Sequence, residues 1–313
     1  MEKLLEVKDL KVSFFTDLGE TQAVKGAGFA IGEGDFFGIV GESGSGKSVT
    51  TKSILRLGPS NCKIMGGEIL FRGEDILKKN EAELREIRGG EIAMIFQDSL
   101  SALNPVYTVG NKMVELIRRH TNMNKKEAKA RVLELLTAVG ITDPEKAMNS
   151  YPHELSGGMR QRVMIAMAMS SDPKVLIADE PTTALDVTIQ AQILHLLLEL
   201  QKKNNMSIIL ITHDLGVVAQ TCKRVAVMCG GYVVEEGTVE EIFLHPGHPY
   251  TQALIASMPR VGGTFEQFLE RDLSDGNGDL CPFLNRCKYA DKTCEACLPK
   301  YYEASEGHRI FCH

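Results

Sequence analysis

A glycine-rich run that ends in lysine and serine is the first feature of this sequence that could do chemistry. Residues 41–48 read GESGSGKS, directly after the apolar run 36–40 and before residues 48–57, whose pattern predicts a helix. Backbone N–H groups of such a turn, with the positive end of the helix dipole, bind phosphates. We therefore expect Lys47 to reach the β- and γ-phosphates of a nucleotide and the Ser48 hydroxyl to ligate Mg²⁺.

Two acidic residues, Asp179 and Glu180, follow a second apolar run, 175–178. An aspartate at the C-terminal end of a buried strand can hold Mg²⁺ opposite a phosphate loop. The glutamate after it can polarise an attacking water. The alternative is a surface acid pair that caps the turn at Pro181, and the phosphate loop elsewhere in the chain favours the catalytic interpretation.

A third candidate is the run LSGGMRQR at residues 155–162, which precedes a predicted helix. Its serine and two glycines leave bare N–H groups at a helix N-terminus, where a second anion could bind. Ser156 could also be an ordinary N-cap, since serine is a preferred cap residue, although a cap does not require paired glycines. One nucleotide site built from both turns needs them face to face. Because a helical insert separates them in one molecule, the pattern implies a dimer.

Strands that alternate with helices must position these residues, and they predict an α/β core with a largely parallel sheet. A helical stretch over about 98–170 interrupts the alternation as an inserted subdomain. Beyond Glu236 the periodicity weakens, and 274–279 have the composition of a linker. Strands are expected at 4–10, 23–31, 36–40, 68–71, 92–96, 175–178, 207–212 and 224–229, and helices at 48–57, 109–119, 125–139, 158–170 and 187–203.

Composition narrows the class of protein. With 43% apolar and 24% charged residues, the 313-residue chain is typical of globular proteins. A net charge of −6 gives no support to a nucleic-acid function. No run of 18 apolar residues could span a bilayer, and the acidic N-terminus does not resemble a signal peptide. We therefore expect a cytosolic chain with reduced thiols.

Five of the eight cysteines lie between residues 281 and 313, which raises the question of a metal site. The spacing of Cys281, Cys287 and Cys294 is wider than a structural zinc knuckle, but Cys294 and Cys297 form one such C-x₂-C pair, with His308 and His313 available. Four thiolates around an iron–sulfur cluster satisfy the pattern equally well. Free buried thiols are disfavoured because the segment has few large apolar residues. Cys62, Cys222 and Cys229 are expected to be core residues.

In their order along the chain, these motifs resemble the ATP-binding subunit of an ABC transporter. The matching motifs are the phosphate loop 41–48, Gln97 within 96–98, the signature 155–159, Asp179-Glu180 followed by 184–186, and His213 within 211–214. The resemblance implies an ABC-type P-loop ATPase core, with an antiparallel β part, an inserted helical subdomain and a small cysteine-rich C-terminal region.

The resemblance also implies roles for single residues. Gln97 would sense Mg²⁺ and the γ-phosphate and face the membrane subunit, and Asp186 would communicate across the dimer. Catalysis would fall to Glu180, His213, Gln97 and Lys47, and Mg²⁺ to Ser48, Gln97 and Asp179. ATP would contact Phe14, Gly41, Ser43, Gly44, Ser45, Gly46, Lys47, Ser48, Val49, Gln97 and Asp179, and the partner's ATP would contact Ser156, Gly157 and Gly158. Phe15 competes with Phe14 for the adenine, and a Phe pair beside Val12 could equally be core.

A narrower resemblance, to dipeptide and oligopeptide importers, rests on residues 181–193, 248–254 and the cysteine-rich tail. The chain departs from that branch in a short segment between Pro259 and Cys281 and in the extra Cys297. The branch implies an ATPase domain over 1–236, an extension over 237–313, and a [4Fe–4S] cluster. Its ligands would be Cys281, Cys287, Cys294 and Cys312.

The function that the resemblance implies is ATP hydrolysis that powers peptide import from the cytoplasmic face of the cell membrane, where the chain would be peripheral. Its partners would be a second ABC ATPase subunit, two membrane permease subunits and, indirectly, an extracytoplasmic solute-binding protein, without nucleic acid. Nickel and glutathione importers share parts of the pattern. The rivals are a soluble ABC ATPase that acts on DNA or ribosomes and a redox or iron sensor. The soluble class tends to carry coiled-coil inserts or two cassettes, and this chain shows neither.

Overall fold

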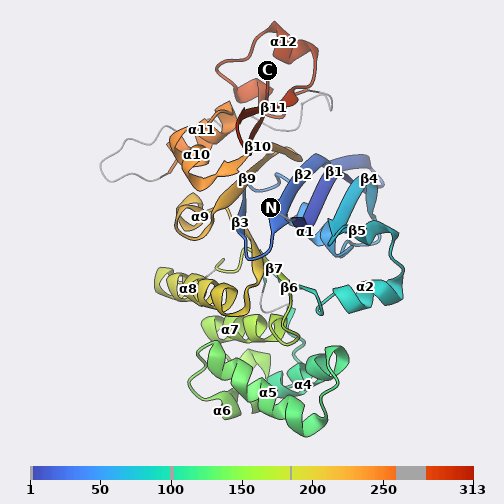
Figure 1. The fold of residues 1–313 in the computed structure, drawn as a ribbon, viewed down its shortest axis with the longest axis vertical. Coiled ribbons are helices and arrows are strands. Elements are labelled where there is room, and N and C mark those ends of the chain that lie inside the picture. The colour runs from blue at the N-terminus through green and yellow to red at the C-terminus, as the bar shows by residue number, and fades with distance from the viewer. Residues whose placement is uncertain (1–2, 99–101, 184, 259–279) are drawn as a thin grey trace. The chain divides into compact units, whose positions relative to one another are not determined.

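The structure, a computed structural model, describes residues 3–98, 102–183, 185–258 and 280–313 (Figure 1). The chain divides into two compact units. The first comprises residues 1–32, 36–78 and 211–313, and the second comprises 33–35 and 79–210. No helix in the described ranges is long and apolar enough to cross a membrane.

An antiparallel sheet forms one part of the first unit, with strand order β2-β1-β4-β5. Leu5 and Val7 of its central strand are buried, as the alternating pattern predicts. A bulge between Val7 and Leu10 shifts the alternation by one residue, so that Leu10 and Val12 also face the core. The strands are β1 (Lys3–Thr16), β2 (Gly19–Gly32), β4 (Cys62–Phe71) and β5 (Glu74–Asp75), and a 3₁₀ turn, η1 (Ile76–Lys78), follows.

A second group of strands in this unit has the order β11-β12-β10-β9-β3. The completely buried strand β3 (Phe36–Val40) pairs in parallel with β9 (Arg224–Cys229), as expected for a strand between covered faces. The other pairs, among β10 (Tyr232–Thr238), β11 (Lys300–Ser305) and β12 (His308–Cys312), are antiparallel. Strand β10 was not predicted, and it joins the end of the chain to the strand beside the phosphate loop.

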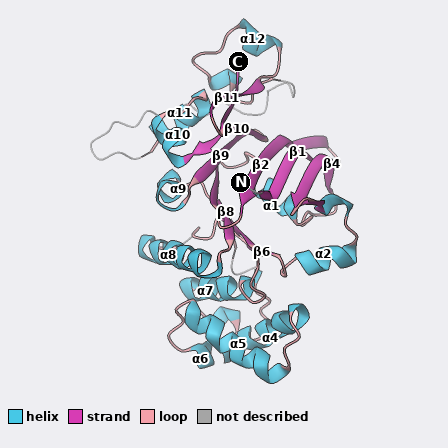
Figure 2. Ribbon diagram, in the orientation of Figure 1, coloured by secondary structure: helices cyan, strands magenta, loops and turns pink. Residues whose placement is uncertain are grey.

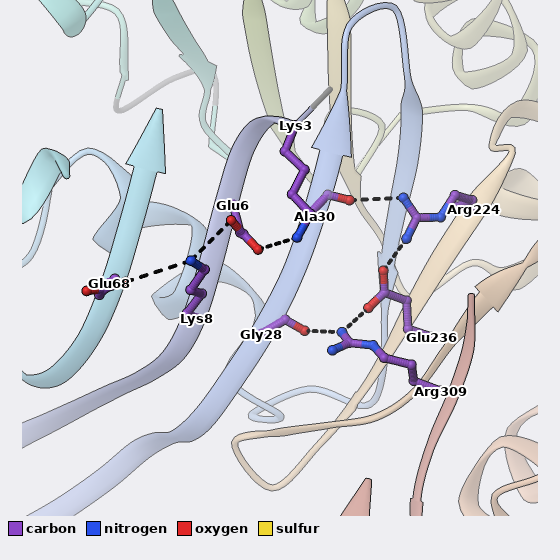
Figure 3. Close-up of polar contacts among 9 residues, drawn as sticks. All are labelled: Lys3, Glu6, Lys8, Gly28, Ala30, Glu68, Arg224, Glu236 and Arg309. Carbon is purple, nitrogen blue, oxygen red and sulfur yellow. Dashed lines mark hydrogen bonds and ion pairs between the residues drawn. The ribbon is translucent and has the colours of Figure 1, made fainter. Parts of the chain in front are cut away.

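Two adjacent glutamates on β10 hold the last strand in place. Arg224 and Arg309 both pair with the Glu236 carboxylate, and the same guanidinium groups donate to the carbonyls of Ala30 and Gly28 on β2 (Figure 3). Glu235 is fully buried, and its carboxylate lies 2.7 Å from Nε2 of His308 on β12. Buried carboxylates need such partners, so these residues fix the C-terminal strands to β10.

Helices dominate the second unit, in which three strands have the order β8-β7-β6 (Figure 2). N-caps at Thr108, Asn124 and Asp143 start three of its helices, and Pro144 occupies the first turn of the third. The elements are α2 (Glu81–Ile87), β6 (Ile92–Ile95), α4 (Val109–His120), α5 (Lys125–Ala138), α6 (Pro144–Asn149), η2 (Pro152–Glu154), α7 (Gly157–Ala168), β7 (Val175–Asp179), α8 (Val187–Asn204) and β8 (Ser207–Ile211).

The predicted mixed α/β architecture is confirmed, including the antiparallel β part and the helices inserted between β6 and β7. The predicted boundary at residue 236 lies within β10. Helices α2 and α6 and the strands after residue 230 were not predicted. The remaining elements are α1 (Lys47–Ile54), α9 (Leu215–Thr221), α10 (Val239–Leu244), α11 (Pro249–Ala256), η4 (Leu284–Arg286) and α12 (Lys292–Ala296).

Candidate functional site

The phosphate loop connects β3 to α1, as predicted. Its glycines are required by space and by backbone conformation: Gly41 has φ +153°, and a Cβ there would lie 2.2 Å from the Met228 carbonyl oxygen. Gly46 has φ +99°, and its Cβ would lie 2.6 Å from the Ala23 carbonyl oxygen. These values favour glycine over any other residue. Ser43 and Gly44, at the tip of the loop, are exposed.

The Lys47 side chain folds back over its own loop. Its ammonium donates to the carbonyl oxygens of Gly41 and Glu42, at 2.8 Å each, and it is 5% exposed. The N–H of Gly231 donates to the Ser45 carbonyl at 3.0 Å. A buried ammonium held by backbone carbonyls is poised to exchange them for phosphate oxygens, which are stronger acceptors. Ser48 and Val49 follow in the first turn of α1, half-buried.

Two further residues predicted to bind the nucleotide, His213 and Phe14, belong to the first unit. His213 is exposed and follows β8, where the N–H of Thr212 donates to the Ile39 carbonyl on β3. The neighbouring strand therefore brings His213 to the end of β3 from which the phosphate loop departs. Phe14 is half-buried on β1, and the Lys63 ammonium lies 5.1 Å from the centre of the Phe15 ring. The adenine contact of Phe14 stays a prediction.

The second unit brings the predicted catalytic acid and Gln97 together. The Gln97 amide donates to Oε2 of Glu180 at 2.9 Å, and the Thr183 hydroxyl donates to the same oxygen at 2.8 Å. Glu180 has φ +46°, a conformation that is uncommon for a residue with a side chain and that gathers at functional sites. Asp179, the last residue of β7, is fully buried. Sequence reasoning missed Thr183, because a threonine after a proline carries no signal of its own.

The signature serine is the N-cap of α7. Its hydroxyl accepts the N–H of Met159 at 3.3 Å, so the ordinary capping role is present. Ser156 itself is exposed, and Gly157 and Gly158 form the first turn. A Cβ at Gly158 would lie 3.2 Å from the Ile189 side chain. The pair of glycines therefore keeps the N-terminus of this 12-residue helix free of side chains. Asp186, in turn, is the N-cap residue of α8.

The four cysteines predicted as cluster ligands line one cavity, in the first unit. The lining includes Cys281, Cys287, Cys294, Cys312 and, from α11 and its N-cap, His248 and Pro249. Burial, the largest cause, and the charges of Cys312, Cys287 and Cys294 raise the pKa of the Cys281 thiol to about 11. In the described part of the chain, no group of three or more histidine, cysteine or acidic side chains already has the spacing of a metal site.

The remaining cysteines lie elsewhere. Cys297 is exposed, and its thiol is 3.7 Å from the carbonyl of Thr293. Cys222 and Cys229 are buried, as predicted for core residues, whereas Cys62 is half-buried. The departure noted between Pro259 and Cys281 falls mainly on residues 259–279, which lie outside the described residues, as does Ala184 of the 184–186 motif.

Comparison with known families and proteins shows the family of the chain. Residues 24–183 match the family model of ABC transporters, and residues 234–294 match that of the C-terminal region of oligopeptide/dipeptide transporters. The chain is 49% identical to the dipeptide transport ATP-binding protein DppD of Bacillus subtilis, over 100% of this chain and 95% of that protein. It is 51% identical to the oligopeptide transport ATP-binding protein OppD of the same organism, over 98% and 88%.

A solved structure shows the same fold. The dimeric structure of MJ0796, a bacterial ABC transporter cassette, is 30% identical, with a TM-score of 0.68, over 75% of this chain and 98% of that chain. The chain belongs to the ABC transporter ATPases, in the branch that carries the oligopeptide/dipeptide transporter C-terminal region.

Proposed function

We propose that this chain is the ATP-hydrolysing subunit that powers import of dipeptides or oligopeptides through an ABC transporter, at the cytoplasmic face of the cell membrane. The observation that carries the chemistry is the 2.9 Å hydrogen bond from Gln97 to Glu180. It orients a carboxylate at the end of a buried strand, where a general base for water would act. The peptide substrate is supported by the transport proteins DppD and OppD, which are similar over nearly the whole chain.

Residues 41–48 bind the phosphates of ATP in this proposal, with Val49 in the helix behind them and Phe14 at the adenine. Ser48, Gln97 and Asp179 supply oxygen ligands, the kind that Mg²⁺ prefers. Bound Mg²⁺ would neutralise phosphate charge. Lys47 and His213 stabilise the charge on the γ-phosphate, and Glu180 aligns the attacking water. In these assignments one set of residues binds the phosphates and Glu180 orients the water, and phosphoryl transfer depends on such positioning.

A second ATPase subunit, identical or related, completes the site. Ser156, Gly157 and Gly158 bind the γ-phosphate of the ATP held by that partner, since the open N-terminus of α7 is suited to an anion. The exposure of Ser156 supports this role, because a group that binds the partner's nucleotide must be accessible in the single chain. Asp186 at the start of α8 communicates across the dimer.

The membrane subunits dock on the second unit. A cavity of about 230 Å³ there is lined by apolar and sulfur-containing side chains from β6, α4 and α7. Phe96, next to Gln97, is 38% exposed at its edge. A groove of this kind accepts the apolar face of a helix, which two permease subunits would supply, with the extracytoplasmic solute-binding protein acting through them. The lining includes Met94, Phe96, Leu103, Leu116, Met164 and Met167.

The cysteine cavity holds a [4Fe–4S] cluster in this proposal. His248 supports the fit: its Nδ1 accepts the N–H of Tyr250, so the neutral ring carries its proton on Nε2. This Nε2 is buried and has no hydrogen-bond partner among the described residues. A sulfur atom in the cavity would accept a hydrogen bond from it. Cys297 does not line the cavity, which favours Cys281, Cys287, Cys294 and Cys312 over the zinc knuckle. A bound cluster would cross-link a segment with little core of its own.

Two measurements test the proposal. The transporter, purified with its membrane partners and reconstituted in vesicles, should couple ATP hydrolysis to peptide uptake. Glu180→Gln should keep ATP binding and reduce turnover about 10²- to 10⁴-fold, the contribution of a general base. Normal hydrolysis in this variant would exclude Glu180 as the base. Protein purified without oxygen should contain roughly four irons per chain and absorb near ~400 nm; stoichiometric zinc without iron would exclude the cluster.

A further inference from the structure

The C-terminal region contacts the phosphate loop at Glu42. The Arg286 guanidinium forms two parallel hydrogen bonds to the Glu42 carboxylate, at 2.7 and 3.1 Å. The Tyr250 hydroxyl accepts the backbone N–H of Glu42 at 2.9 Å. All three residues belong to the first compact unit. Bidentate pairs of this kind fix both the distance and the orientation of the carboxylate.

Glu42 is the second residue of the loop, and the shape of the loop depends on it. Its carbonyl oxygen accepts from the N–H of Ser45 at 3.2 Å and from the Lys47 ammonium at 2.8 Å. The backbone N–H and the carboxylate are held by Tyr250 and Arg286. The carbonyl group of Glu42 is therefore bound within the loop, whereas its N–H and its carboxylate are bound by the C-terminal region.

A compact aromatic group makes this contact rigid. Tyr250 is fully buried, and its ring meets Phe283 edge to face, with the ring centres 5.4 Å apart. The Arg286 guanidinium lies 5.0 Å from the centre of the Phe283 ring and 5.9 Å from that of Tyr250. Such stacking reduces the freedom of the arginine before it meets its carboxylate. The arginine side chain is 11% exposed, so solvent competes little for its hydrogen bonds.

We propose that Arg286 and Tyr250 are positioning residues for ATP, which hold Glu42 so that residues 41–48 keep their phosphate-binding shape before the nucleotide arrives. The proposal rests on the assignment of 41–48 as the ATP site. Neither residue touches the reacting atoms. Their loss therefore raises the KM for ATP and leaves kcat nearly unchanged, since a loop that is already ordered does not pay its ordering entropy on binding.

The test compares ATP affinity and turnover in the complete transporter. Arg286→Gln should raise the KM for ATP about tenfold, a loss of about 1.4 kcal/mol, with kcat within about twofold. Arg286→Lys should recover part of the loss, because it restores the charge but not the two parallel bonds. Tyr250→Phe removes only the acceptor for the Glu42 N–H, and should raise the KM roughly threefold to tenfold.

The control is Arg309→Gln, which breaks an ion pair to Glu236 in the same C-terminal region and should leave the KM unchanged. The double variant Glu42→Gln, Arg286→Gln should have a KM for ATP no higher than that of either single variant, since both substitutions remove the same interaction. Additive losses, a wild-type KM in Arg286→Gln, or an equal loss in the control would overturn the proposal. Lys47→Ala tests the ATP site separately from the positioning role of Arg286 and Tyr250. If this variant keeps its ATP affinity, residues 41–48 are not the ATP site.

Discussion

At the scale of residues, position in the chain predicts chemical role better than residue type does. Glu180 was identified because it follows an apolar strand, and the structure adds two donors to its carboxylate, Gln97 and Thr183. The cysteines show that residue type alone does not define the role, since identical thiols lie in the core, on the surface and around a cavity. Burial and neighbours set the behaviour of each side chain.

Thiol reactivity should separate these environments. Burial raises the pKa of Cys222 to about 12, from an ordinary value of 9.0, and it also raises that of Cys229. At pH 8 Cys222 therefore has roughly a thousand times less thiolate than a free cysteine. Iodoacetamide should label the exposed Cys297 of the native protein and spare Cys222 and Cys229, as read by mass spectrometry. Labelling in urea is the control, and equal native rates would contradict the burial.

At the scale of elements, the start of α7 combines a cap with an open helix end. An aspartate at Gly158 would interact favourably with the helix dipole, so the helix should stay folded. Its charge would, however, oppose a phosphate from the partner subunit. Gly158→Asp should therefore leave the stability of α7 intact while it weakens the contact with the partner's nucleotide.

Gly158→Asp should lower steady-state ATP hydrolysis at least about tenfold, by removing an electrostatic contribution to the transition state. ATP affinity of the single chain, measured by calorimetry, should change less than about twofold, because the residue serves the partner's nucleotide. Gly158→Ala is the control for the contact with Ile189, which a Cβ would approach to 3.2 Å. A large loss of affinity in the single chain would place the signature in the chain's own site.

Strand β12 depends on the buried pair of His308 and Glu235. The side chains are 5% and 0% exposed, and the same carboxylate also accepts the N–H groups of Gly247 and His248. Removing His308 takes one hydrogen-bond partner from a fully buried carboxyl group.

His308→Ala should therefore destabilise the first unit by about 1–3 kcal/mol, the cost of leaving a buried hydrogen-bonding group without that partner. The shift of the urea midpoint at constant m-value measures this change. Lys300→Ala, at an exposed position of β11, is the matched control and should shift the midpoint little. An equal shift in both variants would show that the pair adds nothing specific.

At the scale of the whole molecule, residues that line the cysteine cavity lie directly beside residues that bind the phosphate loop. Cys287 follows Arg286 directly, and Phe283 both lines the cavity and supports the arginine. A change in the cavity therefore reaches the loop through the Arg286–Glu42 pair.

If the cavity holds the proposed cluster, Cys287→Ser should lower the iron content of the protein, and it should lower ATP affinity about as far as Arg286→Gln does. In the Arg286→Gln background it should add little, because the connection is already broken. Nucleotide titration and metal analysis of Cys287→Ser, Arg286→Gln, the double variant and Cys297→Ser measure both effects. Cys297→Ser, outside the cavity, is the control. If Cys287→Ser loses its metal and keeps full ATP affinity, the cavity and the loop are independent.

Prediction from the sequence succeeded where the information is local. The unit of β3, loop and α1 was predicted because an apolar run, the glycines and a helix start lie within 20 residues of one another. Strand β11 was missed because all six of its residues are exposed, and only its pairing with β12 makes it a strand. The role of Arg286 was equally inaccessible, since it contacts a residue 244 positions earlier.

The adjacent glutamates of β10 also restrict how genes of this family can recombine. Glu235 and Glu236 lie in the strand that follows the ATPase motifs, and their partners His308 and Arg309 lie in the last strand. A crossover anywhere between these two positions would join acids from one parent to bases from another. A hybrid whose parents differ in this pairing would lose buried hydrogen bonds and stability, so the two segments should be inherited as a linked set.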